Sequence, residues 1–145
     1  MHAMTKLLFS ERDLRAWLRK NWLQPKGLTW IEQAHGSTHG VPDVILQSLG
    51  MPTELKVMWP RRRSPGYTMA VRPSQCRWHE LNHRAGKRSL FLCGECVMVA
   101  PRLYVLPGHA WPRNPRINEW WLRLREVTNQ ADIEAAVQDG RFWEI

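Results

Sequence analysis

The amino-acid sequence predicts a mixed α/β fold: a helix, a three-stranded β-meander, a second helix and another strand, followed by a C-terminal helical extension. Three observations predict this order. Apolar residues recur at helical spacing after Ser10, short apolar runs bounded by Gly and Pro follow, and Pro73 and Gly86 enclose a segment of helical length. Helical and strand-like patterns that follow one another in this way are typical of domains containing both element types.

The length of the chain indicates one domain. A chain of 145 residues can bury roughly two-thirds of its unfolded surface in a single core. No repeat, low-complexity segment or long linker divides it. We therefore expect one domain over residues 1–145, with a core at about 10–106 and a C-terminal extension at about 107–145.

The first half of the chain is expected to form one helix and three strands. Ser10 is a suitable N-cap for a helix from Glu11 to about Asn21, and Pro25 and Gly27 lie just past its end. Its apolar face would carry Leu14, Trp17 and Leu18. The predicted strands span residues 28–34, 42–48 and 53–59, with a turn at 49–52.

The second half is expected to begin with a basic loop at 60–72. A helix should then run over residues 73–85, because Pro is favoured at a helix start and Gly just past its end. The remaining predicted elements are a strand at 89–93, a further strand at 97–105, and helices at 116–127 and 130–138.

The residues most informative about chemistry lie on the predicted hairpin. Asp43 precedes one strand, and Glu54 and Lys56 lie on the next. Residues i and i+2 of a strand share a face, so Glu54 and Lys56 point the same way. Two carboxylates suit Mg²⁺, which binds one or two protein carboxylates together with water and substrate phosphate oxygens. A neighbouring lysine can orient a water molecule, so the group fits metal-dependent phosphodiester hydrolysis.

These residues belong to a longer sequence pattern that is also found in a known protein superfamily. It comprises Gly40-Val41-Pro42-Asp43-Val44-Ile45-Leu46, then Thr53-Glu54-Leu55-Lys56-Val57, then Arg72-Pro73-Ser74-Gln75, Trp78, Gly86 and Leu90-Phe91-Leu92. The pattern resembles the PD-(D/E)xK nuclease superfamily, and within it the VRR-NUC and Holliday-junction-resolvase-like branch. The resemblance covers roughly residues 10–93. It implies a restriction-endonuclease-like core.

The resemblance also implies roles for single residues. Asp43 and Glu54 would bind Mg²⁺ or Mn²⁺ together with the Leu55 carbonyl, while Lys56 assists the attacking water. Gln75 would hydrogen-bond that water or the neighbouring phosphate. Glu11 on the first helix would supply a further acid beside the metal, and Glu32 competes with it for this role.

DNA is the expected partner. Lys and Arg outnumber Asp and Glu by 21 to 13, giving a net charge of +8 and a pI of about 10.1, which favours a polyanion. Arg61, Arg62, Arg63 and Arg72 are candidates for holding phosphates, although a solvated charge run is an equal alternative. Members of this superfamily often cut branched or flapped DNA as dimers, and compact members are common in phages. The resemblance therefore admits selectivity for such DNA, a homodimer and a phage source for this chain.

A competing motif lies on the second predicted helix. His79-Glu80-Leu81-Asn82-His83 matches HExxH, the signature of zinc proteases. A metzincin needs a third His three residues after Gly86, where Ser89 stands. The hairpin context favours the nuclease over the protease. A DNA-binding module of nuclease fold without catalysis is the other alternative.

The cysteines and the hydropathy pattern add further expectations. Cys76 and His79 with Cys93 and Cys96 have the ligand types of a zinc site, but packing of small apolar side chains is the stronger interpretation. Three Cys without framework spacing favour a reducing, cytoplasmic setting. The resemblance implies that the cell is a bacterium or a phage-infected host. No targeting signal or apolar run of membrane-spanning length is apparent, so we expect no membrane partner.

Overall fold

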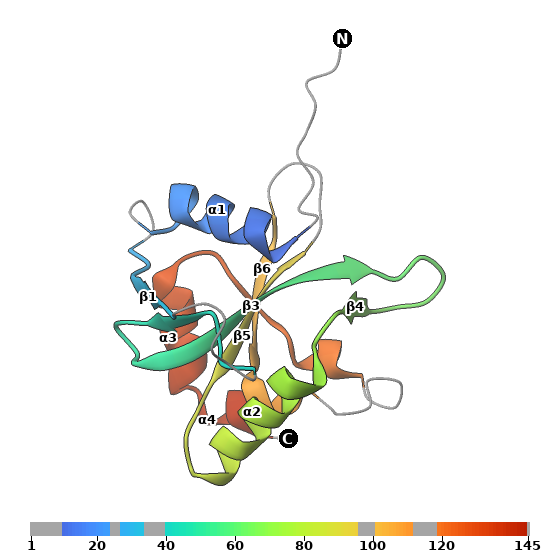
Figure 1. Cartoon of the computed structure of the whole chain (residues 1–145). Helices are drawn as coiled ribbons and strands as arrows, with labels where there is room; N and C mark the ends of the chain where they lie inside the picture. Colours follow the sequence, from blue (N-terminus) through green and yellow to red (C-terminus); the bar gives the residue numbers. More distant parts are fainter. Residues whose placement is uncertain (1–9, 24–26, 34–39, 96–100, 112–118, 145) are drawn as a thin grey trace.

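The computed structural model describes residues 10–23, 27–33, 40–95, 101–111 and 119–144, which form a mixed α/β fold around one sheet (Figure 1). Its helices are α1 (Glu11–Asn21), α2 (Pro73–Arg84), α3 (Gln130–Gln138) and α4 (Gly140–Trp143), with 3₁₀ turns η1 (Gly108–Ala110) and η2 (Trp120–Arg123). Its strands are β1 (Trp30–Glu32), β2 (Val44–Leu46), β3 (Met51–Pro60), β4 (Tyr67–Met69), β5 (Leu90–Glu95), β6 (Leu103–Pro107) and β7 (Arg125–Val127). No helix within these ranges has the length and apolar character needed to span a membrane.

The sheet is mostly antiparallel and has the order β1-β2-β3-β5-β6-β7. β4 pairs with the C-terminal end of β3, residues 58–60. β3 and β5 form the parallel pair. Parallel neighbours need a crossover connection, and α2 lies on the segment that supplies it. The described elements thus follow the predicted order of helix, meander, helix and strand.

Helix α1 forms for reasons visible in its sequence. The Ser10 hydroxyl accepts a hydrogen bond from the Asp13 amide at 3.2 Å, which caps the helix start. Leu14 and Leu18 are fully buried, one turn apart on the face that packs on the sheet. The predicted helix from Glu11 to Asn21 is confirmed.

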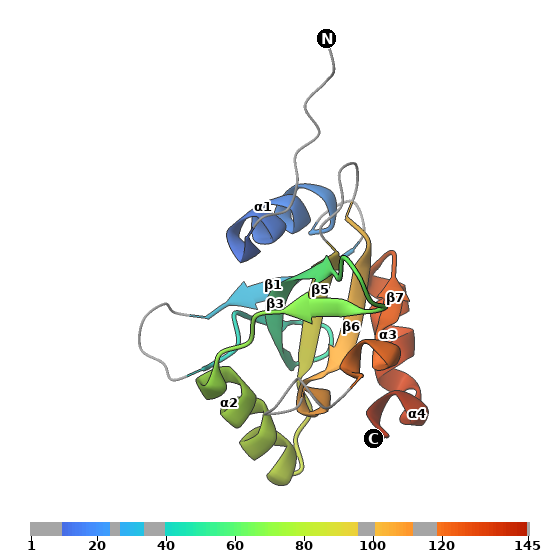
Figure 2. The same cartoon turned by 90° about the vertical axis from the view of Figure 1, so that its right-hand side faces the viewer.

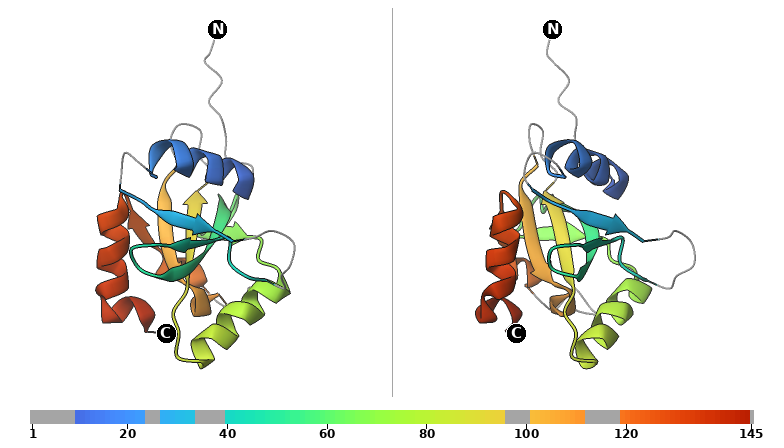
Figure 3. Two further views of the ribbon diagram at one scale, coloured as in Figure 1. Left: turned by 60° about the vertical axis from the view of Figure 1, so that its left-hand side comes forward. Right: turned by 90° about the vertical axis from the view of Figure 1, so that its left-hand side faces the viewer.

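Two apolar clusters cover opposite faces of the sheet. One joins α1 and α3 to the face that carries Leu55 and Val57 of β3. The other includes Met58 and Phe91 and is closed by residues near η1 and η2. β3 passes between α1 at the top and α2 at the bottom of the view in Figure 1, and α3 and α4 lie beside β6 and β7 (Figures 2 and 3).

Three predictions in the second half of the chain need correction. The predicted loop at 60–72 contains β4, which pairs with β3 through Met58 and Met69. Residues 116–118 of the predicted helix at 116–127 lie outside the described residues, and the remainder forms the 3₁₀ turn η2 and strand β7 instead of an α-helix. The C-terminal extension is therefore not only helical, because β7 pairs with β6 and extends the sheet.

The remaining boundaries shift by a few residues. α2 and α3 end within a residue of their predicted limits, and the short helix α4 was not expected. The β2–β3 turn is tighter than predicted, since β3 already begins at Met51, opposite Leu46. Of the strand predicted at 97–105, residues 97–100 lie outside the described residues, and β6 continues to Pro107.

Candidate active site

The hairpin of β2 and β3 brings the two predicted metal-binding acids together. Val44 pairs with Thr53 in the antiparallel register, so Asp43 and Glu54 lie opposite each other at the next position. The Leu55 amide donates a hydrogen bond to Asp43 Oδ2 at 2.9 Å, which fixes the Asp43 carboxylate against β3. The Leu55 backbone therefore lies beside the acids, while metal coordination by its carbonyl remains a prediction.

Gly40 allows the segment before β2 to approach the start of α2. It has a φ of 87°, and a Cβ at this position would lie 2.1 Å from the Ser74 carbonyl oxygen. Any larger residue would collide with backbone atoms, so the Gly of the Gly-x-Pro-Asp pattern permits this close contact. The contact brings the first turn of α2, and with it Gln75, beside the hairpin.

Gln75 is buried and holds Glu54 in place. Its Nε2 donates to Glu54 Oε1 at 2.7 Å, and its Oε1 accepts from the Arg72 amide at 3.0 Å. Both ends of the amide are thus used to orient the acid. The resemblance implies contact with water or phosphate, whereas the structure shows Gln75 bound to Glu54.

Glu54 has an unusual electrostatic environment. Its side chain is 1% exposed, and its Oε2 has no hydrogen-bond donor in the described part of the protein. Burial first, and the Asp43 carboxylate second, raise the pKa of Glu54 from 4.5 to about 9, against the opposing influence of Lys56. Glu54 is therefore protonated at neutral pH without a bound cation, and the proton can be donated to Asp43.

Asp43 is held by a residue that the sequence did not single out. Arg15 donates from a guanidinium nitrogen to Asp43 Oδ1 at 3.1 Å, and both side chains are partly buried. Arg15 follows Glu11 by one helical turn, and residues four apart share a helix face. That spacing was the available signal, because it places Arg15 on the face from which Glu11 reaches the sheet.

Lys56 lies on the same face of β3 as Glu54 and Met58, opposite the face that packs against α1, and its ammonium group reaches Glu11 at the start of that helix. It is 3% exposed, and its Nζ donates to Glu11 Oε1 at 2.8 Å. Glu32, the other candidate for the supplementary acid, instead pairs with Arg19. Glu11 is therefore the acid that contacts this group of residues, and its contact is with Lys56.

The donor set fits a divalent cation of the Mg²⁺ type. Asp43 and Glu54 place two carboxylates together, and a buried Glu54 oxygen has no donor. Within the described ranges no three His, Cys, Asp or Glu side chains converge on one point. Two protein carboxylates match the preference of Mg²⁺, which usually retains several waters and binds substrate phosphate oxygens.

The four arginines predicted to hold phosphates lie in two places. Arg72 immediately precedes α2 and lies beside Gln75. Arg61, Arg62 and Arg63 are exposed beyond the end of β3. Arg61 follows Glu54 by seven residues, which is roughly 20 Å in an extended strand, so the loop does not flank the acids as expected.

The first of these arginines is anchored by the C-terminal part of the chain. The Arg61 guanidinium lies 4.6 Å from the ring centre of Trp121. Gly66, with a φ of 103°, packs so closely on that indole that a Cβ would approach it to 2.5 Å. This contact fixes the β3–β4 loop and leaves Arg62 and Arg63 at its exposed tip.

The two histidines of HExxH have separate environments. His79 is fully buried, its Nδ1 lies 2.6 Å from Ser89 Oγ, and burial lowers its pKa to about 4. His83 is exposed and stacks on His109 at 3.8 Å, while Glu80 pairs with Arg84. The described geometry offers no support for a zinc-protease centre.

Three of the four candidate zinc ligands, Cys76, His79 and Cys93, lie within the described residues. Cys93 is buried in the core, its Sγ contacts Met69 Sδ at 3.6 Å, and burial raises its pKa to about 12. A zinc ligand needs a thiolate, so this environment favours the packing interpretation. Cys96 lies outside the described residues.

The raised pKa of Glu54 gives a testable pH dependence. Below pH 4.5 the group is protonated in both the folded and unfolded chain, whereas between 4.5 and about 9 only the folded state retains the proton. Its contribution to stability is therefore complete at low pH and declines as pH rises towards 9. Glu54→Gln mimics the protonated acid, so in EDTA it should stabilise the protein at pH 8 by an amount on the order of a few kcal/mol, and little at pH 5.

Urea unfolding at both pH values measures this difference. The matched control is Glu126→Gln, which removes an exposed carboxylate paired with Arg102 and should show no such trend. An equal effect of Glu54→Gln at pH 5 and pH 8 would contradict the protonated state of Glu54.

Comparison with known proteins adds no relative: no protein-family model, no curated protein and no solved structure matches the chain.

Proposed function

We propose that this protein is a divalent-metal-dependent DNA endonuclease with a restriction-endonuclease-like core. The observation that carries the proposal is the pairing of the Asp43 and Glu54 carboxyl groups on one hairpin. No donor among the described residues reaches the buried Glu54 Oε2, and Lys56 lies two residues further along β3. The order of α1, the meander, α2 and β5 supports the fold assignment. A net charge of +8 supports a nucleic-acid substrate.

Each residue of the site has a distinct task in this proposal. Asp43 and Glu54 would hold Mg²⁺ or Mn²⁺, which when bound supplies charge neutralisation at the scissile phosphate. Gln75 and Arg15 fix the orientations of these two acids. Lys56 orients the attacking water and offsets charge that develops on the phosphate.

Glu11 acts on Lys56 rather than on the acids. Its carboxylate accepts a hydrogen bond from Lys56 Nζ at 2.8 Å and thereby sets the position of the ammonium group. Hydrolysis then forms one P–O bond from water and breaks the P–O bond to the leaving oxygen, while the attacking water loses a proton to solvent and the leaving oxygen takes one up. A homodimer and a phage origin follow from the resemblance, and a cytoplasmic location follows from the cysteine content; all three belong to the same proposal.

Cleavage assays test this function directly. We expect Mg²⁺- or Mn²⁺-dependent cutting of linear, flapped or four-way DNA that EDTA abolishes. Lys56→Ala should slow single-turnover cleavage by roughly a hundredfold, as expected for loss of one preorganised donor. Asp43→Ala should lose both metal binding and cleavage, and both variants should still bind DNA without metal.

Two glutamate variants form a matched control for this assay. Glu11→Gln removes the acid that holds Lys56, and Glu32→Gln removes the one that holds Arg19. Only Glu11→Gln should slow cleavage. No cleavage of any DNA would favour the binding-module alternative, and wild-type cutting by Lys56→Ala would contradict the role given to that residue.

The arginine loop gives a second prediction, on binding rather than on chemistry. Each lost phosphate contact lowers the salt dependence of DNA binding by about 0.9. Arg62→Gln with Arg63→Gln should lower the slope of log K against log salt by about two. The cleavage rate at saturating DNA should not change, because the loop lies roughly 20 Å along β3 from the acids.

Titrations of DNA binding at several salt concentrations measure this slope. Because Arg61 is anchored on Trp121, its additional replacement should have a smaller effect than that of Arg62 or Arg63. An unchanged slope in the double variant would make the loop an ordinary solvated surface.

A further inference from the structure

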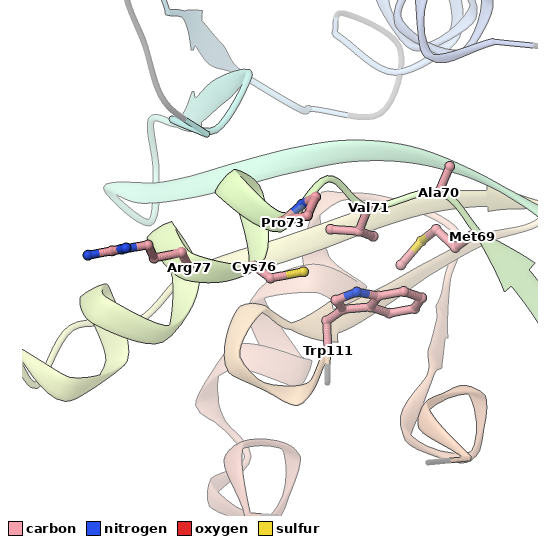
Figure 4. Close-up of a pocket in the computed structure, with 7 residues that line it drawn as sticks. All are labelled: Met69, Ala70, Val71, Pro73, Cys76, Arg77 and Trp111. Atoms are coloured by element: carbon pink, nitrogen blue, oxygen red, sulfur yellow. The ribbon is translucent and has the colours of Figure 1, made fainter. Parts of the chain in front are cut away.

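A cavity of about 460 Å³ lies between the end of β4, the first turns of α2 and the segment after η1 (Figure 4). This volume lies in the range of roughly 300–1,000 Å³ typical of small-molecule sites. Its walls are mostly apolar, and the side chains facing the cavity include Met69, Val71, Cys76 and Trp111. None of the site residues described above lines it.

The cavity is next to the proposed active site. Cys76 follows Gln75, which contacts Glu54, and Met69 pairs with Met58 four residues beyond Glu54 on β3. Arg72, a candidate phosphate ligand, immediately precedes the helix that forms one wall. A DNA strand bound across the acids would therefore place a neighbouring nucleotide near this cavity.

The chemistry of the walls favours a flat group of low polarity. Figure 4 shows the Cys76 sulfur directed towards the Trp111 ring, with the Met69 side chain beside the same ring. Trp111 is held in place by edge-on packing against Trp120 at 4.8 Å. Sulfur and aromatic groups both make favourable contacts with π systems.

The rim of the cavity carries positive charge. Arg77 is exposed, and its guanidinium extends away from the apolar walls (Figure 4). No acidic residue is among the residues that line the cavity. An occupant with a flat apolar part and an attached anion would satisfy both the walls and the rim.

We propose that the cavity binds an unpaired nucleobase of the DNA strand next to the cut, with Arg77 contacting the adjoining phosphate. This inference rests on the proposed nuclease function and adds a binding site to it. Bases within a duplex are stacked and paired, so the cavity would select DNA with unpaired nucleotides beside the cleaved bond. Stacking of a base on an aromatic side chain strengthens binding by about tenfold or more in single-strand binding proteins.

Binding measurements in EDTA separate this site from catalysis. The probe is a duplex with a short single-stranded flap containing the fluorescent base 2-aminopurine, compared with the same duplex fully paired. Cys76→Phe should fill the cavity and weaken flap binding about tenfold, to the level of the paired duplex. Cys76→Ser removes the same thiol but leaves the cavity open, so it should weaken flap binding by no more than about twofold, much less than Cys76→Phe.

Arg77→Gln provides a second arm. It should reduce the salt slope for flap binding by about one, the value for one phosphate contact, and leave the slope for paired duplex unchanged. Thermal melting should show that all variants remain folded. Equal flap binding by Cys76→Phe and Cys76→Ser would overturn the proposal.

A measurement on the unaltered protein avoids dependence on a variant. Alkylation of the Cys76 thiol by iodoacetamide, followed by peptide mass spectrometry, should slow about tenfold when flap DNA is bound, and not when paired duplex is bound. Equal protection by both DNAs would contradict the base-binding site. Protection by an apolar peptide and not by flap DNA would assign the cavity to a protein partner and overturn the proposal.

The outcomes also distinguish this inference from the function on which it rests. If the wild type cuts DNA but Cys76→Phe keeps the wild-type preference for flaps, the cavity proposal fails alone. If no DNA is cut but flap binding still depends on the cavity, the nuclease proposal fails, and the cavity remains a base-binding site.

Discussion

The Glu54 carboxyl group, buried against the Asp43 carboxylate, is the feature on which the rest of the arrangement depends. Burying a charge without a partner is costly, so such a group normally becomes neutral or acquires a cation. The surrounding structure holds Glu54 in this position. Gln75 donates to one oxygen, the hairpin register places Asp43 opposite, and the other oxygen has no donor among the described residues.

The elements around this pair serve to position it. The Gly40 conformation lets the chain before β2 lie against the Ser74 backbone, which brings α2 to the hairpin. From the other side, α1 contributes Arg15 to Asp43 and Glu11 to Lys56. The orientation of the two acids therefore depends on both helices, and displacement of either helix should disturb it.

Local signals in the sequence predicted those parts of the site whose conformation is set by residues close to them in the chain. The Ser10 cap, the Pro73 start and the strand alternation around Glu54 are local, and the structure follows them at α1, α2 and β3. The pattern also identified the acids and Lys56, since their spacing on a hairpin brings them together. The choice between Glu11 and Glu32 needed the direction of α1 over the sheet, which no local pattern contains.

The features that were missed depend on distant pairings. β4 and β7 have three residues each, and their strand conformation comes from pairing with β3 and β6. A run of three residues is too short for periodicity to separate strand from helix. The contact of Arg61 with Trp121 joins positions far apart in the chain, so the sequence could not show that this arginine is anchored.

The central claim is that Asp43 and Glu54 form a divalent-cation site whose Glu54 is protonated until the cation binds. Calorimetric titration with Mn²⁺ at pH 7.5, in two buffers of different ionisation enthalpy, counts the protons released on binding. Metal ligands must be deprotonated, so we expect close to one proton released per ion in the wild type and none in Glu54→Gln. Absence of Mn²⁺ binding to the wild type would contradict the claim, and so would equal proton release by the wild type and Glu54→Gln.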